Sequence, residues 1–226
     1  MFTKPTFDNN IYMKIFQILY TALLANLCFW LAVFPFSAAA LLLDINLGNI
    51  FWFAATSLWL GAGMISLIAL IDQWIREKEI APVKAFFCAM KSFGLKGFLY
   101  WLIGWGGIVI AIVDMRAFSY VTHGQWTYPF FLVLGVCSIG VSINSWYFQV
   151  RNPQAKMKDV LMMSFYYLIR KWYLSIINLS LFVFILLLIF IKPQIGLLLS
   201  PVVLTSLIYL NLYQIGRQKN KQSRSF

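Results

Sequence analysis

Long apolar runs alternate with short polar segments along the whole chain. A helix that crosses a bilayer needs about 20 apolar residues, and six runs fit that pattern, with Pro35 expected to kink or break the first. The runs are Ile15–Leu43, Ile50–Ile71, Phe98 to about Val113, Pro129–Val150, Tyr173–Ile191 and about Gln194–Ile215. The third is the shortest and is expected to begin further upstream. The pattern predicts an all-α, polytopic membrane protein of six transmembrane helices, in one integral membrane domain over residues 1–226.

Basic, aromatic segments precede the third and the fifth run. Apolar side chains recur there at helical spacing while lysines gather on another face, which predicts amphipathic cytoplasmic helices over Pro82–Lys96 and Lys156–Lys171. Their apolar sides are expected in the headgroup boundary or against the bundle. Four lysines are candidates for docking a partner or anionic lipid headgroups: Lys84, Lys91, Lys156 and Lys158. The two segments resemble each other, which is explained equally by an internal repeat and by convergence.

The basic residues divide unevenly between the two sides of the predicted bundle. Of the 18 lysines and arginines, all but Arg116 and Lys192 fall on the side of the termini and of the two amphipathic segments. Because basic residues collect in cytoplasmic loops, this division predicts a plasma-membrane protein with both termini in the cytoplasm and with His123 outside. The first run is expected to be a retained span, since it is too long for a signal peptide.

Composition supports the membrane interpretation. The chain is 62% hydrophobic and only 11% charged, whereas soluble domains are about 45–50% apolar and about 25% charged. The net charge of +11 would also suit a nucleic-acid partner, but the charges avoid the apolar runs. We therefore expect a lipid bilayer as the surroundings and no nucleic acid.

Polar side chains inside the runs are few and are the first candidates for a site. Asn26, Asn144 and Asn178 are expected to hydrogen-bond neighbouring helices rather than face lipid. Asp114 is expected at the outer interface, neutralised by Arg116 or Lys192. Asp72 is expected to form a surface ion pair with Arg76, four residues later. Small residues are expected to allow close contacts between helices, and they include Ser57, Gly61, Gly104, Gly106 and Gly107.

Sequence motifs of the common catalytic classes do not occur. The chain contains no GxxxxGK[ST] phosphate loop, no HExxH pair and no GxSxG elbow, and its single histidine and three separated cysteines form no metal-ligand pattern. No catalytic residue, cofactor or metal site is therefore expected, and the sequence favours a non-enzymatic protein.

Several segments resemble one known family. Asn26–Pro35 (NLCFWLAVFP) is similar to the NLxW…P signature in the first span of the YesL-like membrane proteins. Ile75–Glu79, Val83–Phe87 and Lys91–Phe93 resemble that family's basic loop and aromatic helix, and Lys158–Trp172 fits its late segment. The resemblance implies an integral membrane protein of Gram-positive bacteria without defined catalytic residues, often encoded beside carbohydrate-uptake systems.

Together these patterns predict a non-enzymatic membrane component that docks a partner or anionic lipid through its basic helices, and the resemblance implies that it is an accessory to a carbohydrate transporter. Two alternatives stay open. A small oligomeric transporter or channel would need a water-filled path lined by Asn26, Asn144 and Asn178, and a lipid-active membrane enzyme would need a convergent polar pocket.

Overall fold

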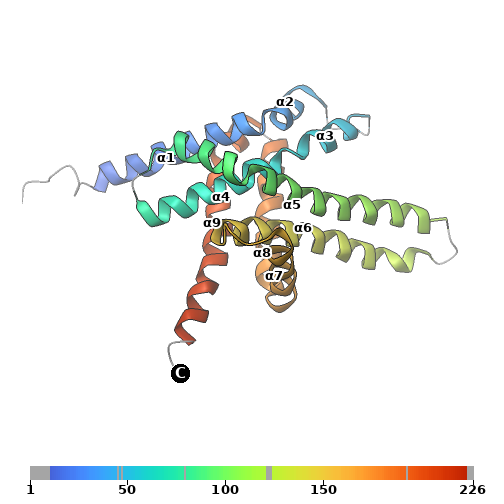
Figure 1. Cartoon of the computed structure of the whole chain (residues 1–226). Coiled ribbons are helices and arrows are strands. Elements are labelled where there is room, and N and C mark those ends of the chain that lie inside the picture. The colour runs from blue at the N-terminus through green and yellow to red at the C-terminus, as the bar shows by residue number, and fades with distance from the viewer. Residues whose placement is uncertain are drawn as a thin grey trace, which may run out of the picture.

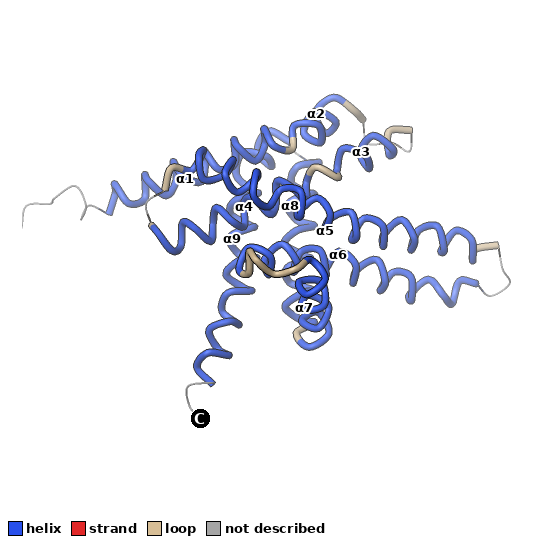
Figure 2. Tube along the Cα trace, in the orientation of Figure 1, coloured by secondary structure: helices blue, strands red, loops and turns tan. Residues whose placement is uncertain are grey.

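Helices make up all the regular secondary structure that the structure describes. The computed structural model describes residues 11–44, 46, 48–78, 80–120, 124–191 and 193–222. Its elements are α1 (Ile11–Ala32), α2 (Phe34–Leu42), α3 (Ile50–Ser57), α4 (Leu60–Glu77), α5 (Pro82–Phe118), the 3-10 helix η2 (Gly124–Thr127), α6 (Tyr128–Arg151), α7 (Met157–Arg170), α8 (Trp172–Ile191) and α9 (Pro193–Gln222). Short loops join them (Figure 2). The all-α class is confirmed.

Five stretches of the described chain are long and apolar enough to cross a membrane. They are Tyr12–Ala32, Phe51–Glu77, Pro82–Phe118, Gln125–Arg151 and Trp172–Ile191. They support a multi-pass membrane protein. In α9 the described apolar stretch, Ser200–Tyr213, is shorter than a span. The sixth span therefore stays a prediction, as do the sidedness of the termini and the position of His123, which lies outside the described residues.

The first two runs each fold as two helices. α1 ends at Ala32 and α2 begins at Phe34, with Pro35 in its first turn, where a missing backbone N–H costs nothing. The break expected at Pro35 is confirmed. The second run is interrupted as well, since α3 ends at Ser57 and α4 begins at Leu60.

The two basic segments fold as helices in different ways. α5 is one unbroken helix of 37 residues from Pro82, about 55 Å long at 1.5 Å per residue, and thus longer than the roughly 30 Å hydrocarbon core of a bilayer. The first segment is therefore an in-line extension of the third span and no separate surface helix. The second segment forms α7, which Lys171 separates from α8.

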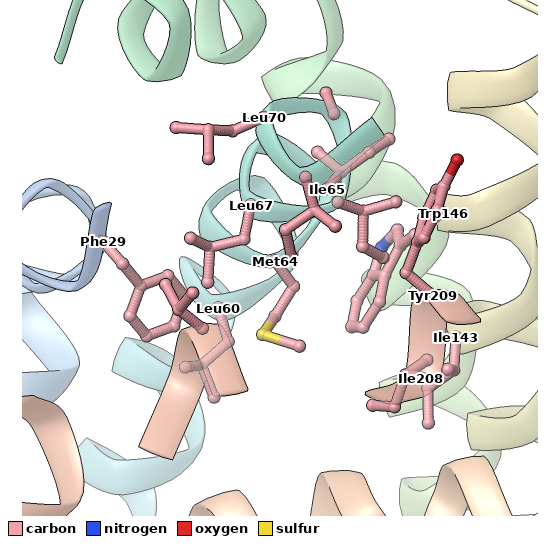
Figure 3. Packing of buried hydrophobic residues seen from close by; sticks show 14 of the residues in the cluster. Phe29, Leu60, Met64, Ile65, Leu67, Leu70, Ile143, Trp146, Ile208 and Tyr209 are labelled. Atoms are coloured by element: carbon pink, nitrogen blue, oxygen red, sulfur yellow. The ribbon is translucent and has the colours of Figure 1, made fainter. Parts of the chain in front are cut away.

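The core is built around α4. Every residue from Leu60 to Asp72 is buried, so this stretch is enclosed on all sides. Figure 3 shows Leu60, Met64 and Ile65 of α4 between Phe29 of α1 and Trp146 of α6. A helix whose apolar side chains are buried on every face lies at the centre of a bundle.

Glycines set the spacing of α4 and α5. A Cβ on Gly97 would lie 2.3 Å from Cγ2 of Ile65 and 2.6 Å from the Gly61 carbonyl oxygen. A Cβ on Gly61 would lie 2.5 Å from Cβ of Trp101. The two backbones therefore touch where these glycines meet. The contact expected at Gly61 is confirmed, and Gly97 is its partner.

The remaining helices surround this pair. α5 and α6 lie side by side as a long hairpin (Figure 1), with Gly104 of α5 against Ser142 and Gly107 against Ser138. A Cβ on Gly106 would meet nothing within 4 Å, so the close contact expected there is wrong. α9 packs on α1, α4 and α8 and runs across the direction of the α5–α6 hairpin in Figure 1.

Candidate functional site

The charged site of the described chain centres on Asp72, in the last turns of α4. Its side chain is fully buried. Oδ1 accepts hydrogen bonds from the Tyr209 hydroxyl at 2.5 Å and from Nη1 of Arg151 at 3.1 Å, while Oδ2 pairs with Nη2 of Arg76. The expected partner Arg76 is confirmed, but the expected surface position is wrong. The carboxylate joins α4, α6 and α9 inside the bundle.

Aromatic rings support the two partners that come from other helices. The Tyr213 ring stacks on Tyr209 with centroids 5.9 Å apart and planes 17° apart, and the Arg151 guanidinium lies 5.4 Å from the centre of the Tyr213 ring. Tyr147 of α6 meets Tyr209 edge-on at 5.5 Å. A buried carboxylate is tolerated only when it is paired and hydrogen-bonded. The aromatic contacts hold Tyr209 and Arg151, which donate hydrogen bonds to the Asp72 carboxylate, in place.

A second polar contact secures the segment that leads into α7. The Tyr100 hydroxyl of α5 donates to Oε1 of Gln149 at 2.6 Å, and Nε2 of Gln149 donates to the carbonyls of Asn152 and Pro153, each at 3.2 Å. Nζ of Lys96 also donates to the Pro153 carbonyl, at 3.3 Å. The turn before α7 is therefore fixed to α5.

The termini of four helices meet near these contacts. We call this the basic end: it comprises the start of α1, the end of α4 and the start of α5, on the left of Figure 1, together with the end of α6. Asp72 brings the ends of α4 and α6 together there. The positive-inside argument predicts that this end faces the cytoplasm.

Two of the candidate asparagines lie as expected at helix contacts with α9. Oδ1 of Asn26 accepts a hydrogen bond from the backbone N–H of Val202 at 2.9 Å, directly after Pro201 inside α9. Oδ1 of Asn178 accepts from Nδ2 of Asn211 at 2.7 Å. The prediction that Asn26 and Asn178 bond neighbouring helices is confirmed.

Asn144 completes the set at a third place. Its Nδ2 donates to the Ser175 hydroxyl of α8 at 3.0 Å, whereas its Oδ1 and Nδ2 of Asn178 have no partner within the described residues. The contacts of Asn26 and Asn178 on α9 are nine residues apart, or about 13 Å along the helix. The three asparagines thus bond at separate helix contacts, each taken up in packing.

The other candidates lie on the surface. Asp114 is partly buried in α5 and forms no ion pair with Arg116 in the described chain, while Lys192 lies outside the described residues. The four docking candidates Lys84, Lys91, Lys156 and Lys158 are all exposed. Lys84 and Lys91 share the outward face of α5, and Lys156 and Lys158 flank the start of α7.

Sequence reasoning missed the depth of Asp72 and its partners Arg151 and Tyr209. A signal was available, because Asp72 continues the stripe of Ile65 and Ile68 at helical spacing and therefore faces the core. Nothing in the sequence pairs it with residues 79 and 137 positions later.

Metal-ligand geometry is not found in the part of the chain that the structure describes, where no three His, Cys, Asp or Glu side chains come together. What the site does chemically is to neutralise one buried carboxylate between three helices. Comparisons of this chain with family models, with curated proteins and with solved structures find no match. The YesL-like resemblance therefore stays a prediction from the sequence.

Proposed function

We propose that this chain is a non-enzymatic membrane component that docks a carbohydrate-uptake transporter through α7 and the adjoining basic end. The observation that carries the proposal is the outward surface of α7. Its apolar side chains there are largely exposed, with exposed fractions of 63% for Met162, 54% for Phe165 and 60% for Ile169. Lys156 and Lys158 stand exposed at the start of the same helix. A contiguous exposed apolar surface beside charge is typical of a contact site.

The inner side of α7 holds this surface in a fixed orientation. Val160 and Ser164 are buried, and the Ser164 and Ser145 hydroxyls are 2.9 Å apart, which ties α7 to α6. A helix that is anchored along one side and exposes apolar residues along another offers an ordered surface, so binding there costs little ordering entropy.

Charge indicates the kind of partner. Lys84, Lys91, Lys156 and Lys158 form no salt bridge within the described residues, and all are exposed. Exposed basic side chains that form no salt bridge favour a partner surface that carries carboxylates. The choice of a carbohydrate transporter as that partner rests on the YesL-like resemblance.

The use of the buried polar groups supports a structural role. Asp72 and the three asparagines each form a hydrogen bond across a helix contact, and each thereby helps to hold the bundle together. A catalytic or transport site needs polar groups that converge on a ligand. The surface of α7 offers exposed groups that this packing does not use.

Site-specific photo-crosslinking in the native host tests the proposal. A photoreactive residue at Met162 is expected to crosslink to a subunit of a carbohydrate transporter, and the same residue at the buried position Val160 serves as the matched control. Lys156→Glu with Lys158→Glu should abolish that crosslink and lower uptake of the labelled sugar. Crosslinks from position 162 to lipid alone, or uptake unchanged by the charge reversal, would refute the proposal.

A further inference from the structure

A groove of about 1040 Å³ lies on the surface of the bundle, and none of its lining residues belongs to α7. Its walls come from the first half of α1, the end of α4 and the middle of α9. They are mainly apolar, and their lining residues include Phe16, Tyr20, Ile71, Trp74, Ile75 and Leu210. The volume slightly exceeds the range of about 300–1,000 Å³ that is common for ligand sites.

The mouth of the groove faces the surroundings of the bundle. Phe16 is 68% exposed and Tyr20 is 55% exposed, and both belong to the candidate span Tyr12–Ala32. Trp74 and Ile75 lie in the last turns of the candidate span that includes α4. A groove between two such spans opens toward acyl chains, so its natural occupant has an apolar tail.

Both charged residues among those that line the groove are lysines. Lys14 lies one turn into α1 and Lys78 directly follows α4, so both belong to the basic end. Among the acidic side chains that the structure describes at the end of α4, Asp72 is held by Arg76, Arg151 and Tyr209, and Glu77 accepts a hydrogen bond from Gln73 at 2.8 Å. The apolar walls of the groove therefore suit an acyl chain, and the part of the groove near Lys14 and Lys78 suits an anionic group.

The backbone of Lys78 adds an independent observation. Lys78 has φ of 61°, the single positive φ among the described non-glycine residues. Glycine adopts a positive φ readily, whereas a Cβ makes it unfavourable. A lysine in this position keeps an unfavourable backbone conformation and places a positive charge beside the groove.

We propose that this groove binds an anionic phospholipid of the membrane leaflet at the basic end. One acyl chain would lie between α1, α4 and α9, with the phosphate between Lys14 and Lys78. The site is separate from the α7 surface and does not depend on the proposed docking function.

Native mass spectrometry of the full-length protein tests the site, with phosphatidylglycerol as the probe. Phosphatidylglycerol should bind more tightly than phosphatidylcholine and than diacylglycerol, which lacks the phosphate. Lys14→Ala and Lys78→Gly should each weaken its binding about fivefold, since a lysine near an anionic surface contributes about that factor. Lys78→Gly should leave thermal stability unchanged or raised, because glycine accepts the backbone conformation.

Arg116→Ala removes the same charge from the far end of α5 and is the matched control. It should bind phosphatidylglycerol as the unmodified protein does. Equal binding of all three lipids, or phosphatidylglycerol binding that is unaffected by both lysine substitutions, would overturn the proposal. Binding of inorganic phosphate as tight as that of phosphatidylglycerol would also overturn it, since the groove would then serve a free anion.

Discussion

The three partners of the Asp72 carboxylate differ in their access to water. The Arg76 side chain is 63% exposed and the Arg151 side chain is 37% exposed, whereas Tyr209 is 1% exposed. Exposed arginines contribute little, because solvent screens their charge. The buried tyrosine hydroxyl cannot hydrogen-bond to water instead, so its hydrogen bond to the carboxylate contributes more to the free energy of unfolding.

Tyr209→Phe is therefore expected to lower the free energy of unfolding by about 1.5–3 kcal/mol, as for a hydrogen bond to a charged group. Arg76→Ala should lower it by less than about 1 kcal/mol. Reversible unfolding in detergent measures both changes. In a double-mutant cycle, Asp72→Asn and Tyr209→Phe together should cost less than the sum of the two single changes.

Tyr213→Phe is the control for this cycle. It keeps the ring that stacks on Tyr209 and removes a hydroxyl that is not bonded to Asp72. Its effect should be small and additive with that of Asp72→Asn. Equal losses for Phe at positions 209 and 213 would contradict the role assigned to Tyr209.

For individual residues, the sequence predicted which groups bond to one another better than it predicted how deeply each side chain is buried. The helix-bonding role of Asn26 and Asn178 followed from the cost of an unpaired amide in an apolar medium. Asp72 was placed at the surface because Arg76, four residues away, was a sufficient partner on its own. The partners that decide its burial come from α6 and α9, and local spacing carries no information about them.

Among the helices, the contact between α4 and α5 depends most on residue size. Gly97→Ala should lower the free energy of unfolding by about 1–3 kcal/mol, because its Cβ would overlap Ile65 and the Gly61 carbonyl and the helices would have to separate. The measurement is again unfolding in detergent.

Gly106→Ala is the matched control nine residues further along α5, where a Cβ meets nothing within 4 Å. It should leave stability unchanged or raise it by up to about 1 kcal/mol, since alanine favours helix more than glycine does. Comparable losses from both substitutions would show that the close approach at Gly97 is not what holds α4 against α5.

Helix existence was predictable from the apolar runs, and helix boundaries were not. The break at Pro35 follows from the proline itself. No proline or polar cluster in the sequence indicates the break between Ser57 and Leu60. The sequence also does not indicate that α5 continues without a break from its basic segment into the third span. Amphipathic spacing suits a surface helix and a helix extension equally well, so only packing against α4 distinguishes them.

For the whole molecule, the basic residues predict which end faces the cytoplasm. In a background that lacks Cys28, Cys88 and Cys137, cysteines at positions 84, 158 and 221 should react with an impermeant thiol reagent only after the membrane is opened. A cysteine at position 123 should react from outside in intact cells. Labelling of position 123 only after opening would reverse the orientation.

The sequence and the structure differ in the number of spans that they support: the sequence predicts six, and the described chain has five stretches long and apolar enough to cross a membrane. Both indicate several membrane-crossing helices, because a chain with so many apolar residues needs a nonpolar surrounding. The sixth rests on an even count of spans that keeps the basic residues on one side. The exposed apolar surface of α7 could not be located from the sequence, because it depends on which side of the helix the fold leaves uncovered.

The wide sequence separation of the Asp72 partners also bears on how the protein is made. Arg76 follows Asp72 by 4 residues, but Arg151 comes 79 residues later and Tyr209 comes 137 residues later. At synthesis rates of about 5–20 residues per second, the ribosome adds the last partner on the order of 10 s after the first. During that interval α4 enters the membrane with an incompletely paired carboxylate. A newly made chain therefore carries an incompletely paired buried carboxylate until Tyr209 has been added, and any chain that stops short of Tyr209 keeps it.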